Sequence, residues 1–210
     1  IDIEPTRSGV IIGAGSMCCD LPELSQAVSS SLTDGVFDLK KWGAGGMESL
    51  TPLWLLKYLP NMLSCHVSII YDLQGPSNCI TCGESSGLMS IGEAHRQITR
   101  GKADLILAGG AESKVNAMCV MRLCLKKFIN TSSNDMPEKA SRPFDSDSKG
   151  VIYAEGGAIV VLEDREKATA RGAKIYGEIT GFASSFNHSL DGSRSEERRV
   201  GKECRSRWSP

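Results

Sequence analysis

The sequence predicts an α/β protein built on a parallel sheet. Residues 8–15 (SGVIIGAG) form a short apolar run between glycines, which is typical of a buried strand in a parallel sheet. A strand ending near Cys82, a helical apolar pattern over Ser85–Arg100 and a strand over Asp104–Ala108 follow one another at the spacing of a strand–helix–strand unit. The 210 residues are 40% hydrophobic and include 22 glycines, which fits an ordinary globular domain.

Further elements are predicted from the same kinds of signal. In chain order they are a helix over Leu21–Leu32, a loop over Gly43–Gly46 (GAGG), a helical stretch over Leu50–Leu63, a strand over Val67–Asp72 (VSIIYD), a strand through Cys79–Cys82, a helix over Ala117–Lys127, a polar loop over Asn130–Pro137, a strand over Ala158–Leu162, a helix over Asp164–Arg171 and a strand over Ile175–Ile179. Pro60 interrupts the helical stretch, and Gly101 ends the helix of the strand–helix–strand unit.

Composition argues against a membrane protein and against a nucleic-acid-binding protein. No apolar run approaches the roughly eighteen residues of a membrane span, and residues 1–5 (IDIEP) have neither the basic nor the apolar part of a secretory signal. The formal net charge is −1, and it becomes more negative without the Arg-rich end of the chain, so no basic footprint for nucleic acid is present. We expect a cytoplasmic protein with no membrane and no nucleic-acid partner.

The cysteines and histidines predict neither a disulfide framework nor a metal site. Of the eight cysteines, seven precede the Arg-rich end as an odd, scattered set, and no pair of CxxC motifs is present. His66, His95 and His188 do not cluster with cysteines at zinc spacing. Gly13–Ser16 (GAGS) lacks the third glycine and the later acidic residue of a dinucleotide-binding turn, so a tight strand-to-helix turn is preferred. We expect no metal and no cofactor.

The end of the chain, residues 194–210 (RSEERRVGKECRSRWSP), differs from the rest. It is dense in Arg and has no apolar periodicity that could join a core. One interpretation is a solvated basic tail. We prefer another: the string resembles the translation of a sequencing-library adapter joined to a truncated reading frame, and such a segment is left out of fold reasoning.

Four stretches, in order and at matching separations, resemble the elongating β-ketoacyl-[acyl-carrier-protein] synthases. They are Gly75-Pro76-Ser77; Ser86-Gly87 through Ile91-Gly92-Glu93-Ala94; Ala103-Asp104 through Ala108-Gly109-Gly110-Ala111-Glu112; and Ala140-Ser141-Arg142-Pro143-Phe144-Asp145 followed by Glu155-Gly156-Gly157. Each stretch alone is weak, whereas the series is specific. The resemblance covers residues 8–187 and corresponds to the middle of a longer family member.

This resemblance implies the thiolase-like αβαβα layered fold, present here incompletely. Residues 1–170 are then most of the N-terminal synthase half, residues 171–193 the start of the C-terminal half, and residues 194–210 the adapter-derived tail. Arg142 and Asp145 are expected to pair in a bend.

The family's nucleophilic cysteine sits three residues before the glycine that matches Gly87, where a buried strand meets its helix. Counting back gives Glu84, in the run 81–87 (TCGESSG). A helix start stabilises a thiolate or a carboxylate, but a carboxylate is a poor acyl carrier because the acyl group must remain on a good leaving atom. Glu84 as a mere helix-start carboxylate is the alternative. Cys82 is the weaker candidate, since it shares a face with Glu84 only if the strand continues through Gly83; we expect it to be a packed strand residue.

The family's two catalytic histidines come from the C-terminal half, so we expect the catalytic His pair to be absent from this chain. The three histidines present are assigned structural roles, because none has the motif context of a catalytic residue. His95 is expected on the apolar side of its helix, His66 at the start of a strand and His188 in a polar loop.

The resemblance implies a β-ketoacyl-carrier-protein synthase homologue of fatty-acid or polyketide biosynthesis. Because Glu84 replaces the cysteine, the first hypothesis is a non-condensing subunit similar to a polyketide chain-length factor. The second is an active 3-oxoacyl-carrier-protein synthase, performing decarboxylative Claisen condensation of an acyl thioester with malonyl-carrier protein, or a malonyl decarboxylase. An ionised Glu84 would repel a malonyl carboxylate by roughly 4 kcal/mol at about 4 Å for an effective dielectric near 20.

A third hypothesis is an inactive truncated fragment. The partners implied are an acyl carrier protein, an acyl thioester substrate and a second synthase subunit, in a homodimer or a heterodimer.

Overall fold

The computed structural model describes residues 4–15 and 19–185. The chain divides into two units, Ile1–Ile179 and Thr180–Pro210, and all the helices and strands described below belong to the first. The predicted adapter-derived tail and His188 lie outside the described residues.

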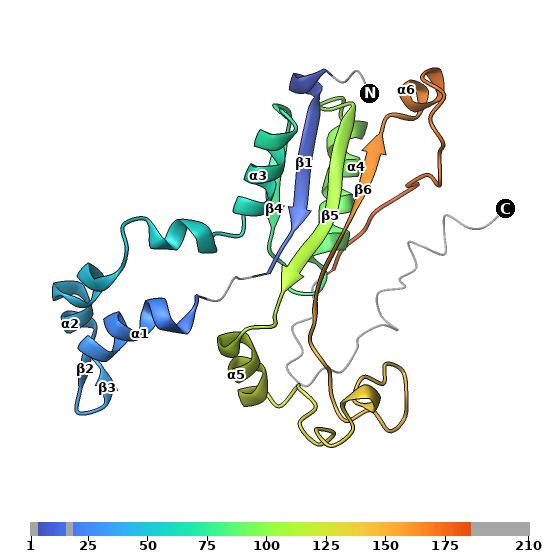
Figure 1. Ribbon diagram of the computed structural model, residues 1–210. Helices are drawn as coiled ribbons and strands as arrows, with labels where there is room; N and C mark the ends of the chain where they lie inside the picture. Colours follow the sequence, from blue (N-terminus) through green and yellow to red (C-terminus); the bar gives the residue numbers. More distant parts are fainter. Residues whose placement is uncertain (1–3, 16–18, 186–210) are drawn as a thin grey trace. The chain divides into compact units, whose positions relative to one another are not determined.

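A four-stranded sheet in the order β4-β1-β5-β6 organises the first unit (Figure 1). Its strands are β1 Ser8–Gly13, β4 Ser77–Ile80, β5 Leu105–Ser113 and β6 Glu155–Glu163. Strand β1 pairs in parallel with β4 and β5, whereas β6 runs antiparallel to β5. The predicted α/β class is confirmed, and β6 adds an antiparallel edge strand to the expected parallel sheet.

The described residues also form six α-helices, four short 3₁₀-helices and a two-stranded hairpin. The α-helices are α1 Leu21–Ser30, α2 Leu39–Ala44, α3 Met62–Ile70, α4 Ser86–Thr99, α5 Ala117–Leu125 and α6 Arg165–Ala170. The hairpin pairs β2 Leu32–Thr33 with β3 Val36–Phe37, and the 3₁₀-helices cover Pro5–Arg7, Gly46–Ser49, Trp54–Tyr58 and Pro137–Lys139. Within this part of the chain, no helix has the length and apolar character needed to cross a bilayer.

Alternating side chains of β1 pack against helices on the two faces of the sheet. Ile11 belongs to a buried cluster with Ala94 of α4. Its neighbours Val10 and Ile12 belong to a second cluster, against which Val67 of α3 packs. Because successive strand residues point to opposite faces, α3 and α4 cover opposite sides of the sheet, as Figure 1 shows.

The predicted strand–helix–strand unit is formed by β4, α4 and β5. Both strands run parallel to β1, which lies between them. Helix α4 ends just before Gly101, whose φ of +67° suits the left-handed conformation that glycine adopts readily.

Two predicted strands are wrong. The run Val67–Asp72 lies largely in α3, which continues to Ile70. Its β-branched residues favour a strand locally, but Leu63 and Val67 lie one helical turn apart and pack together against the sheet, so this burial favours the helix. Residues Ile175–Ile179 have no regular structure, and no described strand pairs with them to form a sheet edge.

The stretch between α1 and α3 also differs from the prediction. Gly43–Gly46, predicted as a loop, lies partly in α2, and its last glycine opens a 3₁₀-helix. Leu50–Leu63, predicted as helical, contains the 3₁₀-helix Trp54–Tyr58 and joins α3 only at its end. Leu53, with a φ of +61°, and Pro60 break the α-helical backbone between these segments.

An ion cluster joins the start of β1, the start of β5 and helix α6. Asp104 accepts hydrogen bonds from Arg7 Nε at 2.7 Å and Arg7 Nη2 at 2.6 Å, and another from Lys167 Nζ. The two hydrogen bonds from Arg7, followed by the one from Lys167, hold the pKa of the Asp104 carboxyl well below its usual range. Asp104 is thus the shared anion of the two cations, and its side chain is only 20% exposed.

We predict that Asp104→Asn lowers the free energy of unfolding by roughly 1.5–3 kcal/mol at neutral pH, the range for losing hydrogen bonds to charged groups. Because the folded pKa of Asp104 lies below the unfolded value, its contribution is complete above about pH 4 and is lost as the pH falls through the folded value. Denaturant unfolding of both proteins across this range measures the difference. Asp147→Asn, at a carboxylate whose side chain is 74% exposed, is the control. A difference that does not narrow in acid contradicts the prediction.

Candidate functional site

The turn between β4 and α4, residues 81–85, is built around one glycine. Gly83 has a φ of +58°, in the left-handed region that glycine adopts without steric cost. The buried hydroxyl of Ser86 donates to the Gly83 carbonyl at 2.6 Å and accepts from the Cys82 N–H at 2.8 Å. These two hydrogen bonds fix the turn from inside and leave the Glu84 side chain on its exposed side.

Close backbone contacts hold the first turn of α4 against the sheet. A Cβ added to Gly13 of β1 would lie 2.2 Å from the carbonyl carbon of Ser86, so only glycine permits this approach. One turn later, the Ser90 hydroxyl donates to the Gly109 carbonyl at 2.5 Å and accepts from the Gly109 N–H at 3.1 Å. The turn follows the carboxyl end of β4, and the carboxyl ends of parallel strands are where α/β proteins place ligand sites.

Glu84 lies two residues before α4, and its side chain is 83% exposed. Its Oε1 is 3.8 Å from Nζ of Lys114, which follows the end of β5. The residue at the predicted nucleophile position is therefore paired with a cation that sequence reasoning did not identify. A single lysine after a strand carries no distinctive signal, because only the fold brings it to the β4–α4 turn.

The expectation that Cys82 is a packed strand residue is wrong. Strand β4 ends at Ile80, and Cys82 is exposed in the turn, outside the strand. Gly83 turns the chain between Cys82 and Glu84, which stops the strand. Cys79, by contrast, is half-buried within β4, and burial, followed by the neighbouring Cys65, raises the pKa of its thiol.

A cavity of about 310 Å³ opens beside Glu84. Its lining is mixed in charge, and the charged side chains and the tyrosine are Glu84, Glu112, Lys114, Arg122, Lys126 and Tyr153. Apolar lining comes from α5 and the residues after it, including Leu123 and Phe128. The cavity thus offers three cationic and two anionic side chains around a partly apolar space.

Lys114 has the least exposed side chain of the three ion-paired residues at this cavity. Its side chain is 21% exposed, and its Nζ lies 3.2 Å from Glu112 Oε2. Burial alone would lower the pKa of Lys114, but the hydrogen bond and charge of Glu112, with the charge of Glu84, outweigh it and raise that pKa. The ammonium also lies 5.2 Å from the centroid of the Tyr153 ring.

A second cavity, of about 510 Å³, lies along the segment 51–66. Its lining is mainly apolar and includes Leu53, Trp54, Leu56, Met62 and Leu63. At its rim, Glu23 of α1 binds Lys57 and accepts a hydrogen bond from the Tyr58 hydroxyl at 2.6 Å. Burial, followed by this hydrogen bond, raises the pKa of Tyr58.

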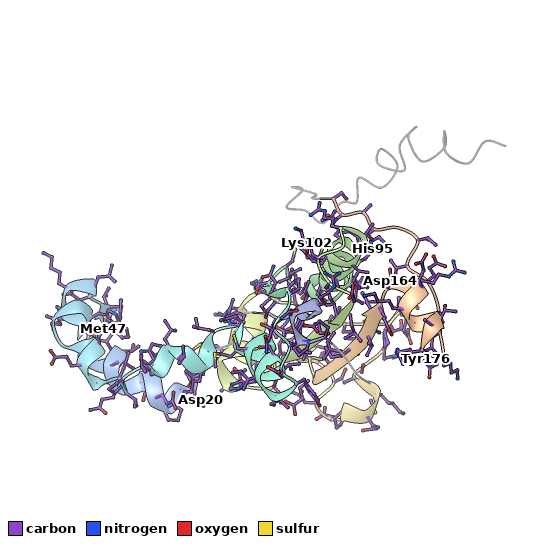
Figure 2. The ribbon with its side chains drawn as sticks, turned by 90° about the horizontal axis from the view of Figure 1, so that it is seen from above. Asp20, Met47, His95, Lys102, Asp164 and Tyr176 are labelled. Atoms are coloured by element: carbon purple, nitrogen blue, oxygen red, sulfur yellow. The ribbon has the colours of Figure 1, made fainter. Side chains whose placement is uncertain are left out.

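The histidines take separate positions. His66 does not open a strand, as the sequence predicts, but lies exposed on α3, because that helix replaces the predicted strand. His95 lies half-buried in α4 (Figure 2). Among the described residues, no three His, Cys, Asp or Glu side chains are grouped so as to hold a metal ion. Arg142 and Asp145 pair as expected, with Nη2 and Oδ2 2.8 Å apart.

Comparison with known proteins gives a consistent set of relatives. The family model described as "Beta-ketoacyl synthase, N-terminal domain" matches residues 2–168. The mitochondrial 3-oxoacyl-[acyl-carrier-protein] synthase of Arabidopsis thaliana is 38% identical over 183 residues, covering 87% of this chain and 37% of that protein. The chain therefore spans less than half the length of this relative.

Solved structures agree on the fold. A beta-ketoacyl synthase from Burkholderia phymatum STM815 superposes with a TM-score of 0.65 at 29% identity, covering 82% of this chain and 39% of that one. The ishigamide ketosynthase/chain length factor superposes with a TM-score of 0.57 at 24% identity, covering 82% and 38%. The predicted thiolase-like layered fold, present as part of a longer architecture, is confirmed.

We predict that Ser86→Ala loosens the β4–α4 turn and costs roughly 1–3 kcal/mol of unfolding free energy, because two hydrogen bonds of a buried hydroxyl are lost. Denaturant unfolding measures the cost, and hydrogen exchange should show a faster-exchanging Cys82 amide. Ser85→Ala is the matched control, since the exposed Ser85 hydroxyl makes one bond, to the Cys82 carbonyl at 3.1 Å. Equal effects of the two substitutions would mean that Ser86 does not hold the turn.

Proposed function

Because the chain belongs to the β-ketoacyl synthase family, we propose that it is a synthase-like subunit of fatty-acid or polyketide biosynthesis that carries no acyl chain itself. In this role it resembles a chain-length factor: it shapes an acyl-binding space beside a partner subunit that supplies the nucleophile. The observation that carries the proposal is Glu84, in the turn between β4 and α4, at the position where the resemblance places the family's cysteine.

The chemistry of Glu84 supports this role. In the family reaction a thiolate attacks the thioester carbonyl, a new carbon–sulfur bond forms, and the carrier thiol leaves. A carboxylate would instead form a mixed anhydride, which is prone to hydrolysis and is a poor carrier for an acyl group awaiting a carbanion. Glu84 therefore fits a subunit that binds acyl chains without transferring them.

The second candidate is an active synthase or a malonyl decarboxylase, and the cationic lining of the first cavity favours it. Repulsion between Glu84 and a malonyl carboxylate is offset by Lys114, 3.8 Å from Glu84, and by Arg122 and Lys126 in the same lining. Decarboxylation needs no acyl-carrying thiol, so release of carbon dioxide from a malonyl thioester distinguishes this candidate. A third candidate, an inactive fragment, is expected to yield neither product nor a functional pair with a partner subunit.

We propose an acyl carrier protein, an acyl thioester and a second synthase subunit as partners, in a homodimer or heterodimer. Exposed apolar side chains support further association: Ile69, Ile70 and Tyr71, around the end of α3, are 77%, 71% and 66% exposed. Strand β4 also leaves one edge unpaired within the described sheet.

We also propose that residues 1–170 and 171–193 are parts of the two synthase halves and that residues 194–210 are a non-native tail. We propose the cytoplasm as the location.

We predict that the protein gains no covalent acyl group when incubated with an acyl-carrier thioester, whereas Glu84→Cys gains one at position 84. The start of α4 and Lys114 both stabilise a thiolate there, which promotes its attack. Intact-mass spectrometry followed by peptide mapping locates the adduct. Glu84→Cys combined with Cys82→Ser is the control that separates the two sulfurs.

An acyl adduct on Cys82 of the unmodified protein would overturn the proposal, as would formation of a 3-oxoacyl product without a partner. Determining the coding sequence beyond Ser193 adds an independent check. A continuation that contains the family's histidine motifs would support the active-synthase candidate.

A further inference from the structure

Lys114 occupies a defined place between two carboxylates. It follows β5, and its Nζ lies 3.2 Å from Glu112 Oε2 and 3.8 Å from Glu84 Oε1. The same ammonium lies 5.2 Å from the centroid of the Tyr153 ring, and all four side chains line the first cavity. The contacts come from three segments: the β4–α4 turn, the end of β5 and the segment before β6.

We propose that Lys114 is the positioning residue of the Glu84 site: clamped by Glu112, its ammonium draws the Glu84 carboxylate across the cavity mouth toward the end of β5. The inference rests on the proposed function for the identity of Glu84 as the nucleophile-position residue. It goes beyond that function by assigning the residue that orients Glu84 and sets its charge environment.

The rigidity of the clamp follows from Glu112. This residue is part of β5 and is paired in register with Gly156 of β6, so its backbone cannot shift without breaking the antiparallel ladder. The Lys114 side chain is 21% exposed, whereas that of Glu84 is 83% exposed. An enclosed cation anchored to a strand therefore restrains a carboxylate that otherwise projects into solvent.

The clamp also keeps the amine of Lys114 unreactive. Glu84 and Glu112 provide the anionic surroundings, Tyr153 contributes its ring face, and Arg122 and Lys126 of the α5 region line the cavity as like charges. The carboxylates outweigh burial and raise the pKa of Lys114, so the group stays an ammonium with no lone pair for attack. A thioester entering the cavity therefore meets an ammonium at Lys114 and not a free amine.

Acylation of Lys114 by a small thioester tests this inference. In that reaction the neutral amine attacks the thioester carbonyl, an amide bond forms, the carbon–sulfur bond breaks, and the thiol leaves with the proton. The full chain is incubated with S-acetyl-N-acetylcysteamine across a series of pH values, and peptide mass spectrometry quantifies acetylation at Lys114. Lys139 and Lys174 serve as internal references.

We predict that Glu84→Gln increases the acylation rate of Lys114 at least threefold at a fixed pH below the lysine pKa, and that Glu112→Gln increases it about tenfold, because losing either carboxylate lowers the Lys114 pKa and leaves more neutral amine. The double substitution should give the largest increase. Glu84→Asp, which keeps the charge, should remain close to the unmodified protein. Lys114→Arg removes the signal and identifies the peptide.

The acylation measurements separate the effect of Glu84 on Lys114 from that of Glu112. A Lys114 pH profile unchanged by Glu84→Gln, with a shift in Glu112→Gln, would overturn the positioning role, because Lys114 would then pair with Glu112 alone. Glu84 is exposed, so its substitution preserves the fold, and unaltered reference lysines verify this. Failure of the proposed function appears separately, as an acyl thioester on Cys82, and leaves the Lys114 profile unaffected.

Discussion

Backbone contact between the start of α4 and the glycines of the sheet is the constraint on which the site depends. A Cβ on Gly13 would lie 2.2 Å from the Ser86 carbonyl carbon, and a Cβ on Gly110 would lie 3.1 Å from the Cα of Gly87. The buried Ser90 hydroxyl locks the next turn to β5. Because α4 is held against the sheet in this way, the β4–α4 turn before it is fixed as well. Glu84 in that turn therefore lies at the carboxyl edge of the strands.

The same packing sets the charges that surround the Glu84 side chain. Considered alone, an ionised carboxylate repels an acidic substrate by several kcal/mol at an effective dielectric near 20. The fold brings Lys114 to 3.8 Å from it and adds two more cations to the same lining. Electrostatics therefore does not separate a decarboxylase from a non-condensing subunit. The proposed non-condensing role rests instead on Glu84 at the position where the resemblance places the family's cysteine, since Cys82 lies outside β4 on the exposed turn.

Sequence reasoning succeeded where local pattern and tertiary packing agree. Residues 8–13, the glycine-bounded helix α4 and strand β5 combine a clear period with glycine at the positions that need it. It failed at Val67–Ile70, where β-branched residues indicate a strand but burial against β1 selects a helix. The Glu84–Lys114 pair was not predictable, because thirty positions of chain separate residues that only the β4–α4–β5 arrangement brings together.

The same helix start has different consequences for sulfur and for oxygen. A thiol is mostly protonated near neutral pH and depends on a helix N-terminus and nearby cations to become a nucleophile, whereas a carboxylic acid ionises without such help. With Glu84 at the proposed nucleophile position, α4 and Lys114 have a carboxyl group beside them in place of a thiol that they would activate. Under the proposed function, the turn of a condensing site is thus retained without its acyl-carrying thiol. What the turn still contributes is the shape and charge of the cavity beside it, which is the contribution that a partner subunit could use.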